Sequence, residues 1–491
     1  MKTLGELRKS GYQSQSVKDE LRKNMIRKMK SGEELFPGIL GYDKTVLPQL
    51  QNAILARHDI ILLGLRGQAK TRILRLLVNF LDEKIPVIEG SEVNDDPLNP
   101  ISKFGREMVI KNGDETPIAW LEREKRYGEK LATPDTTVAD LIGDLDPIKA
   151  ASKKLTLADE EVINFGLIPR TNRGIFVINE LPDLQPRIQV ALLNIMQERD
   201  IQIRGFNVRI PMDVSLAFSA NPEDYTNRGN IITPLKDRID SQIITHYPRD
   251  LKVASEITKQ EAWDNRNGDI KVDIPEFYRN VLEYVAFEAR DSEYIDQKSG
   301  VSTRMTITAM EQVVSAAERR ALVNKESKAT LRVTDLFYMI PALTGKLELV
   351  YEGEQEGAVN VAKHLLGKAI RRAFLDNFED PSGKQGEGNV NPYDKVLDWF
   401  ASGNSLEIPD MMPEKDYKNA LEKVDGLMEL VQSRPSINKD DLYPVMDLVI
   451  EALHQYSKLG KEDVDDTRSY SDMLGSMLGG MGGFDEDDFD I

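Results

Sequence analysis

Short apolar runs recur through the first half of the chain, at residues 60–63, 84–89, 174–178, 214–219 and 241–247. Each run is followed within two residues by Gly, Asn or Pro. Runs of this length that are apolar on both faces are typical of buried parallel strands. Helical patterns separate the runs, so we predict an α/β fold whose core is a five-stranded parallel sheet covered on both faces.

The segments between these runs predict helices and insertions. Residues 46–57 and 181–199 have amphipathic helical patterns, and residues 72–81 place Ile73, Leu74, Leu77 and Leu81 on one helical face. Residues 91–172 are polar and show no clear strand. We therefore expect insertions to decorate the sheet between its second and third strands.

A β-hairpin is predicted at residues 201–210. Apolar and polar residues alternate there on both sides of Gly205, which is a hairpin signature. Arg204 and Arg209 are expected to face outward from this hairpin.

The rest of the chain predicts further domains. Residues 1–35 form a polar leader, which is either one helix at 16–30 or a mobile segment. Residues 36–248 form the sheet domain, and the helical patterns in 249–380 predict an all-α domain. Residues 383–391 resemble a linker, and further helices follow within a helical region at 381–460. The acidic, Gly- and Met-rich residues 461–491 are expected to be a disordered tail, either solubilising or a docking peptide.

Composition excludes several classes of function. The net charge of −18 argues against a general nucleic-acid binder, because that affinity comes mostly from cationic side chains. The absence of cysteine excludes disulfides, zinc–thiolate sites and thiol nucleophiles, and the four histidines lack metal-site spacing. No run of about 18 apolar residues and no signal-peptide pattern is seen, so we expect a soluble, cytoplasmic protein without membrane insertion.

The stretch GLRGQAKT at residues 64–71 lies between a strand and an amphipathic helix, which is the layout of a phosphate-binding loop. Lys70 is expected to reach the β- and γ-phosphates of ATP, and the Thr71 hydroxyl to bind Mg²⁺. The loop residues expected to surround the nucleotide with them are Gly64, Arg66, Gly67, Gln68 and Ala69. Ala69 replaces a glycine of the usual pattern, so we expect it in a right-handed conformation.

Further polar residues follow the later strands. Asn179 and Glu180 come after the third strand, where a metal-binding group and a base for the attacking water are needed. Asn179 stands where Asp is usual, so it brings no charge to Mg²⁺. Asn221 follows the next strand and is either a γ-phosphate contact or a turn cap. Because carboxyl ends of parallel strands meet at one edge, these residues should converge there.

Two arginines have open interpretations. Arg238 precedes the last strand and is either a finger for a neighbouring subunit's site or half of a surface ion pair. Arg304 opens a predicted helix of the second domain, where it either contacts phosphate or faces solvent.

The order of these motifs resembles that of AAA+ ATPases of the MoxR and magnesium-chelatase ATPase-subunit group. The similarity runs from about residue 36 to 347 and includes FPGILGYD, GLRGQAKT as Walker A, GLIPRTNRGIFVINELPDL around Walker B, SANPEDY, PLKDRID and GVSTRMT. Within this group the 201–210 hairpin corresponds to the pre-sensor-1 insertion.

The resemblance implies roles for single residues. Lys70 and Thr71 would contact phosphate and Mg²⁺, and Glu180 would be the catalytic base. Asn221 would be sensor 1, Arg238 the arginine finger acting in trans, and Arg304 sensor 2. Asn179 departs from the group's usual Asp.

The resemblance also implies an ATP-hydrolysing ring, expected to be a hexamer, that remodels a partner or helps to insert a metal or cofactor. The partner often has a von Willebrand A domain, which this chain lacks, so it would be a separate protein. The alternatives are a chelatase motor of tetrapyrrole biosynthesis and a nucleotide-gated scaffold that does not hydrolyse ATP. A nucleic-acid motor is disfavoured by the acidic charge.

Overall fold

The computed structural model describes residues 1–154, 159–203, 209–221, 230–266, 268, 270–382, 391–464 and 466–473. The chain divides into two units, Met1–Tyr247 and Pro248–Ile491. Among the described residues, no helix combines the length and the apolarity that are needed to cross a bilayer.

The first unit is built on a five-stranded sheet in the order β11-β1-β10-β7-β4, with every pair parallel. Its strands are β1 (Ile60–Leu63), β4 (Tyr127–Leu131), β7 (Gly174–Asn179), β10 (Val214–Ala220) and β11 (Ser241–Ile244). The α/β fold class predicted from the sequence is therefore confirmed.

One strand of the prediction was wrong. The run at 84–89 forms β2 (Lys84–Ile88), but β2 pairs antiparallel with β3 (Ile118–Glu122) outside the core sheet. The fifth position belongs instead to β4, from the segment expected to hold no strand. β4 lies at the edge of the sheet and has the sequence YGEKL, so it lacks the apolar run by which central strands are recognised.

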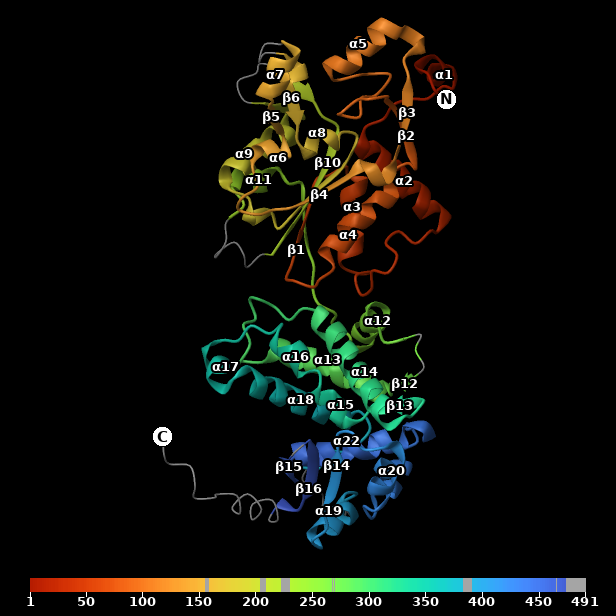
Figure 1. Ribbon diagram of the computed structural model, residues 1–491, viewed down its shortest axis with the longest axis vertical. Coiled ribbons are helices and arrows are strands. Elements are labelled where there is room, and N and C mark those ends of the chain that lie inside the picture. The colour runs from red at the N-terminus through yellow and green to blue at the C-terminus, as the bar shows by residue number, and fades with distance from the viewer. Residues whose placement is uncertain are drawn as a thin grey trace. The chain divides into compact units, whose positions relative to one another are not determined.

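Alternating side chains of the strands build two apolar cores, one on each face of the sheet. Ile60 and Leu62 pack with helices near the N-terminus, whereas Ile61 packs with helices that follow β7. Figure 1 shows α2, α3 and α4 on one side of the strands and α9 and α11 on the other. The sheet is therefore covered on both faces, as the apolar strands require.

The helices of the first unit vary from single turns to four turns. Their bounds are α1 (Leu4–Lys9), α2 (Val17–Ser31), α3 (Val46–Leu55), α4 (Lys70–Leu76), α5 (Lys103–Asn112), α6 (Val138–Leu141), α7 (Pro147–Lys153), α8 (Leu167–Arg170), α9 (Pro186–Gln197) and α11 (Thr233–Arg238). A short pair, β5 (Gly143–Leu145) and β6 (Ile163–Phe165), also lies in the segment expected to lack strands.

The leader is part of the first unit's core. Val17, Leu21 and Met25 on α2 are buried in the same apolar cluster as β1. Glu20 forms an ion pair with Arg126, and both side chains are at most 3 % exposed. A mobile leader is therefore excluded for α2, because removing it would expose this cluster and leave Arg126 buried without its partner.

The predicted hairpin is present in its two arms. β8 (Asp200–Gln202) pairs antiparallel with β9 (Arg209–Pro211). The side chain of Arg209 is 61 % exposed and lies 3.5 Å from Asp200. Arg204 and Gly205 lie outside the described residues.

The second unit is mainly helical. Its helices are α12 (Leu251–Glu261), α13 (Glu276–Asp291), α14 (Arg304–Asn324), α15 (Val333–Phe337), α16 (Ile340–Thr344), α17 (Tyr351–Glu356), α18 (Ala358–Leu375), α19 (Asp394–Ala401), α20 (Glu414–Glu422), α21 (Leu427–Gln432) and α22 (Leu442–Gln455). Its strands are β12 (Lys271–Asp273), β13 (Lys328–Thr330), β14 (Leu406–Pro409), β15 (Gly460–Val464) and β16 (Thr467–Ser471).

Three expectations for this half need correction. The region 249–380 is not all-α, because β12 and β13 pair within it. No break in the core occurs near 380, since one apolar cluster extends from Ile270 to Tyr470. The expected tail begins too early, because β15 and β16 form a three-stranded sheet with β14 and bury Tyr470. Most of the expected linker and the end of the tail lie outside the described residues.

Candidate functional site

The loop between β1 and α4 curls around the ammonium group of Lys70. Lys70 Nζ donates a hydrogen bond to the Leu65 carbonyl at 3.0 Å and another to the Gly64 carbonyl. The Lys70 residue is only 7 % exposed. In this conformation the cation is held by the loop's own carbonyl oxygens, from which it can be exchanged to phosphate oxygens of similar geometry.

Gly64 is required by packing at the start of the loop. A Cβ atom there would lie 1.9 Å from Thr245 Oγ1 and 2.2 Å from Gln68 Oε1. Those two atoms hydrogen-bond to each other at 2.6 Å, so neither can move away without breaking that contact. The residue therefore brings the end of β11 into contact with the loop.

The expected conformation of Ala69 was wrong. Ala69 has φ 56° and ψ 15°, in the left-handed region, and it precedes the first residue of α4. A left-handed alanine costs about 1 kcal/mol or more, because its Cβ approaches the following carbonyl. The loop therefore imposes a left-handed backbone on this alanine.

Two tyrosines support the loop from outside, and the sequence prediction missed both. The Tyr42 hydroxyl donates to the Gln68 carbonyl at 3.1 Å and lies 2.7 Å from the His246 carbonyl. The Tyr247 hydroxyl donates to the Arg66 carbonyl at 2.8 Å. Burial raises the pKa of Tyr42 to about 12, so its hydroxyl remains a donor at neutral pH. Tyr42 belongs to the FPGILGYD motif, which was the available signal.

Polar side chains from neighbouring strands meet next to the loop. Asn179 Oδ1 accepts from Ser219 Oγ at 2.8 Å and lies 3.5 Å from the Thr71 hydroxyl, which donates to it. Asn179 Nδ2 donates to Glu129 Oε1 at 2.8 Å. We call Thr71, Glu129, Asn179 and Ser219 the rim network. It joins α4, β4, β7 and β10 at the carboxyl edge of the sheet.

The sequence prediction missed two members of the rim network, Ser219 and Glu129, and Glu129 has further partners. Arg75 donates to its carboxylate from Nε at 2.8 Å and from Nη2 at 3.0 Å, and the Tyr127 hydroxyl donates at 3.1 Å. The hydrogen bond from Arg75 is the main cause of a lowered pKa for Glu129, so the group is a carboxylate at neutral pH. No sequence pattern pointed to Glu129, because β4 lacks the apolar run that is typical of a core strand.

Glu180 has a strained backbone. Its φ of 54° and ψ of 52° lie in the left-handed region, and its N–H donates to Ser219 Oγ at 3.4 Å. Its side chain is partly exposed, unlike that of Asn179. Ala69 and Glu180 thus place two left-handed non-glycine residues at the same edge of the sheet. Such strain gathers at functional sites more often than elsewhere.

The remaining predicted residues are placed differently. Asn221 directly follows β10, at the same edge, and is partly exposed. Arg238 ends α11, where its guanidinium donates twice to Gln197 Oε1, at 3.0 and 2.9 Å. Arg304 opens α14 of the second unit with an exposed side chain. The structure therefore brings Lys70, Thr71, Asn179 and Glu180 to the same edge, with Asn221 following the next strand.

The donor set at this edge suits Mg²⁺ bound together with phosphate. Among the described residues, no group of three or more His, Cys, Asp or Glu could hold a metal ion. Mg²⁺, however, commonly takes few protein oxygens and completes its shell with water and substrate phosphate. The Thr71 hydroxyl and the Asn179 amide oxygen, 3.5 Å apart, are the oxygens that would face such an ion.

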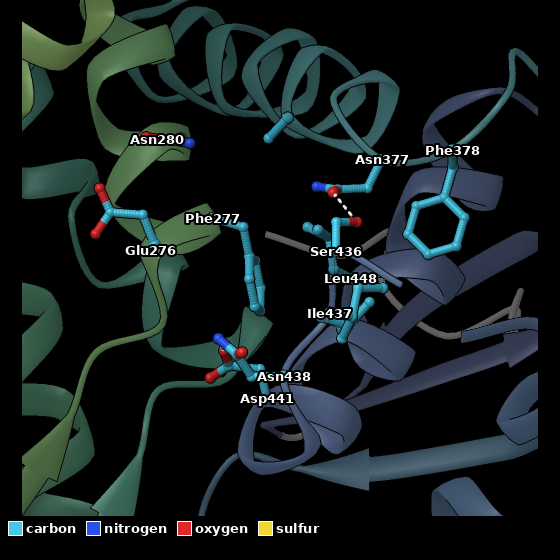
Figure 2. A pocket seen from close by; sticks show the side chains of 12 residues that line it. Glu276, Phe277, Asn280, Asn377, Phe378, Ser436, Ile437, Asn438, Asp441 and Leu448 are labelled. Carbon is cyan, nitrogen blue, oxygen red and sulfur yellow. Dashed lines mark hydrogen bonds between the residues drawn. The ribbon is translucent and has the colours of Figure 1, made fainter. Parts of the chain in front are cut away.

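A pocket of about 170 Å³ in the second unit is less suited to nucleotide. Figure 2 shows Phe277 pointing into it, opposite Asn377 and Ser436, which are joined by a hydrogen bond of 2.8 Å. Its described lining contains the carboxylates Glu276 and Asp441 and no Lys or Arg. A triphosphate would therefore meet negative charge there, whereas the loop at Lys70 offers positive charge.

Comparisons with known proteins find similarity to one described family and to subunits of magnesium chelatase. A family model described as the sigma-54 interaction domain matches residues 155–244. The magnesium-chelatase 38 kDa subunit of Rhodobacter capsulatus is 27 % identical over 248 residues, covering 49 % of this chain and 64 % of that protein. The same subunit of Cereibacter sphaeroides is 31 % identical over 127 residues, covering 25 % of this chain and 35 % of that protein. The chain thus spans less than two thirds of these relatives.

A solved structure is also similar. One chain in a cryo-EM reconstruction of the complex between the BchI and BchD subunits of magnesium chelatase is 19 % identical, with a TM-score of 0.33. The alignment covers 65 % of this chain and 98 % of that chain. The parallel sheet, the phosphate-binding loop and the sequence matches agree: the chain is similar to AAA+ ATPases and distantly related to the magnesium-chelatase 38 kDa subunit.

Proposed function

We propose that this protein binds Mg–ATP at the loop 64–71 and hydrolyses it. The supporting observation is the arrangement of Lys70, Thr71, Asn179 and Glu180 at one edge of one sheet, although more than 100 positions separate the first from the last. Lys70 would neutralise the β- and γ-phosphates, and Thr71 and Asn179 would face Mg²⁺. Such positioning and charge neutralisation are most of what phosphoryl transfer to water requires.

Glu180 is the proposed base that orients the attacking water, and Asn221 the residue that contacts the γ-phosphate. Glu180 is partly exposed and follows β7 directly, so its carboxylate can meet a water molecule at the strand edge. Asn221 occupies the corresponding position after the adjacent strand β10. An amide donor there would sense whether the γ-phosphate is present.

Assembly into a ring, expected to be a hexamer, follows from the proposed role of Arg238. Arg238 lies on α11 with its guanidinium held at the surface by Gln197, as a finger acting on a neighbouring subunit would be. Arg304 is proposed as sensor 2. The work of such a ring would be chaperone-like remodelling of a partner or assistance in inserting a metal or cofactor.

A separate protein with a von Willebrand A domain is the proposed partner. Its basis is the relationship to the magnesium-chelatase 38 kDa subunit, together with the BchI–BchD complex that the similar solved structure contains. A chelatase motor itself is the narrower alternative. Adding a porphyrin, Mg²⁺ and a candidate partner to the protein with ATP would test it by the absorbance change of metal insertion.

A nucleotide-gated scaffold is the second candidate, and Asn179 favours it. An uncharged amide in place of Asp holds Mg²⁺ less strongly, which lowers hydrolysis more than binding. A scaffold would bind Mg–ATP and release no phosphate at any protein concentration.

The test compares the wild-type protein with Lys70→Ala and Glu180→Gln in ATP binding and phosphate release. Lys70→Ala should weaken ATP binding by about 100-fold, because a charge-assisted contact contributes about 1.5–3 kcal/mol and 1.4 kcal/mol is tenfold. Glu180→Gln should bind ATP normally and release phosphate at least about 100-fold more slowly. Lys23→Ala, at an exposed lysine of α2, is the control.

The outcomes separate the candidates. Unchanged ATP affinity in Lys70→Ala would refute the loop assignment. Normal turnover in Glu180→Gln would remove Glu180 as the base. ATP binding without phosphate release in the wild-type protein would support the scaffold. A pull-down with Glu180→Gln in ATP would then identify the partner, because ATP should stay bound.

A further inference from the structure

Asn179 leaves the expected metal position without a charge of its own, and a carboxylate stands immediately beside it. Glu129 Oε1 lies 2.8 Å from Asn179 Nδ2, on the strand that pairs with β7. In the register of these strands Leu131 is opposite Asn179. Glu129 is two residues before Leu131, so its side chain lies on the same face of the sheet as that of Asn179, close enough for a direct contact.

The contact with Glu129 decides how the Asn179 amide is oriented. A carboxylate only accepts hydrogen bonds, so it must face the NH₂ group of the amide and not its oxygen. The amide oxygen is then directed toward Thr71 and Ser219, whose hydroxyls donate to it. Without an acceptor on the other side, the amide could rotate by 180° and present donors to the metal position.

Glu129 is itself held by more than one element. Arg75 from α4 donates to both carboxylate oxygens, and Tyr127 from β4 donates to one of them. The side chain of Glu129 is 22 % exposed, whereas that of Arg75 is 64 % exposed. A surface ion pair alone would not need the Tyr127 and Asn179 contacts, which fix the carboxylate at the rim.

We propose that Glu129 is a positioning residue that holds the Asn179 amide oxygen toward Thr71 and supplies, from the adjacent strand, the carboxylate that β7 lacks. This proposal rests on the proposed function of the same site. Because Arg75 partly neutralises Glu129, orientation of the amide is the larger contribution and the added charge the smaller. Glu129 thereby sets the concentration of Mg²⁺ at which ATP binds in its productive form.

The test measures binding of a fluorescent ATP analogue as Mg²⁺ is titrated. Glu129→Gln should need about tenfold more Mg²⁺ for half-maximal enhancement, because the Gln amide is uncharged and can present either its oxygen or its NH₂ group to Asn179, so it no longer fixes that side chain. Loss of such an orienting group costs about 10- to 100-fold in metal affinity. Its affinity for the analogue in EDTA should equal that of the wild type. A merely structural role for Glu129 would lower thermal stability without this selective change in the Mg²⁺ requirement.

The double variant Asn179→Asp with Glu129→Gln sharpens the test. It exchanges the carboxylate and the amide between the two positions, so an amide donor again faces a carboxylate and oxygen again faces Thr71. Its Mg²⁺ requirement should return to within about threefold of wild type. Glu124→Gln is the matched control, because Glu124 also pairs with an arginine, Arg123, at 3.0 Å but is no part of the rim network.

Different results would contradict the role of Glu129 and the proposed binding of Mg–ATP. An unchanged Mg²⁺ requirement in Glu129→Gln, or a double variant no better than Glu129→Gln, would overturn the role of Glu129 while leaving nucleotide binding intact. Failure of the wild-type protein to bind the analogue at any Mg²⁺ concentration would overturn the proposed function itself.

Discussion

Two groups of hydrogen-bonded polar side chains, one in each unit, differ in burial and in what they hold. The rim network of the first unit lies at a strand edge and includes the partly exposed Thr71. In the second unit Arg468 lies 3.6 Å from Asp447 and 3.9 Å from Glu451, and it donates to the Tyr470 hydroxyl. We call these four residues the core network. Its two carboxylate side chains are 0 % exposed.

The difference shows that burial of charge alone does not identify a functional site. Burial raises the pKa of Glu451, but Lys461 and Arg468 outweigh it and lower that pKa to about 2. The charges of the core network are thus compensated only together with Lys461, and all these side chains are buried. The rim network leaves side chains at an edge that a ligand can reach. We therefore expect rim residues to affect activity without stability, and core residues to affect stability without activity.

The largest expected effect is on turnover, at Arg238. Arg238→Ala should lower phosphate release by about a thousandfold or more, because a finger stabilises charge that develops in the transition state. Stability should change by less than about 0.5 kcal/mol, as for most surface substitutions. Phosphate release and thermal unfolding measure the two effects, with Lys236→Ala on the exposed part of the same helix as control.

Mixing two inactive variants tests whether Arg238 acts in trans. In the proposed ring, a mixture of Arg238→Ala and Lys70→Ala subunits would contain sites with an intact loop next to a subunit with an intact arginine. Phosphate release should therefore recover in the mixture. Absence of recovery, with mixed assembly demonstrated, would contradict an action between subunits.

The core network gives the next largest effect. Arg468→Met should lower the free energy of unfolding of the second unit by about 3–5 kcal/mol, because Asp447 would remain buried without its charged partner, whereas Glu451 would keep Lys461. ATP affinity should stay unchanged. Urea unfolding followed by the fluorescence of Trp263 and Trp399, both in the second unit, measures the change.

An exposed ion pair of the same unit is the control for that experiment. Arg372, 45 % exposed, lies 3.0 Å from Glu288, so Arg372→Met should cost at most about 1 kcal/mol. Equal losses of unfolding free energy in both variants would contradict the distinction between buried and exposed charge.

A buried carboxyl between α12, α13 and α14 should make the second unit's stability depend on pH. Burial raises the pKa of Glu283 from 4.5 to about 7, while the Thr258 hydroxyl and Arg290 oppose the rise. Thr258 also contacts Thr306, in the first turn of α14. Since the folded form keeps the proton longer than the unfolded one, stability should fall as pH rises from about 4.5 to 7.

The matching substitution is Glu283→Gln, which keeps an acceptor for Thr258 and cannot ionise. At pH 8 it should raise the unfolding free energy by up to about 3 kcal/mol, from 1.36 kcal/mol per pKa unit. The dependence over pH 4.5–7 should also weaken. Urea unfolding at pH 5 and pH 8 measures both; identical pH profiles for the two proteins would exclude Glu283 as the source.

The parts of the site that the sequence predicted are those with a local pattern. The loop at Lys70 and the pair Asn179–Glu180 follow apolar strands, and the closing strands have the same apolar character. Parallel pairing then brings strand ends together without further information. Lys70, Thr71 and Asn179 could therefore be placed at one edge before their distances were known.

The parts that the sequence missed depend on non-local packing. Glu129 belongs to a polar edge strand whose position is fixed by β7 and not by its own apolar residues. The left-handed Ala69 is imposed by the loop, against the preference of alanine. Strands β15 and β16 lie in an acidic segment, but Tyr470 and Arg468 anchor β16 in the second unit's core. Composition predicted disorder in this segment because an average over many residues does not show that a few of them are anchored in a core.

The smallest expected effect is at Arg75, on the exposed side of the rim. Arg75→Ala removes the ion pair with Glu129, which should cost at most about 1 kcal/mol of stability because the arginine side chain is 64 % exposed. Glu129 would keep its contacts with Tyr127 and Asn179. The Mg²⁺ requirement for ATP binding should therefore change by less than about threefold, in the same titration used for Glu129→Gln.

Adding salt should shift the Mg²⁺ requirement of the wild type toward that of Arg75→Ala, since an exposed ion pair is screened. If Arg75→Ala instead matched Glu129→Gln, the arginine would be holding the carboxylate in place. The Tyr127 and Asn179 contacts would then be insufficient, and the position of Glu129 would depend on the exposed Arg75 as much as on these two residues.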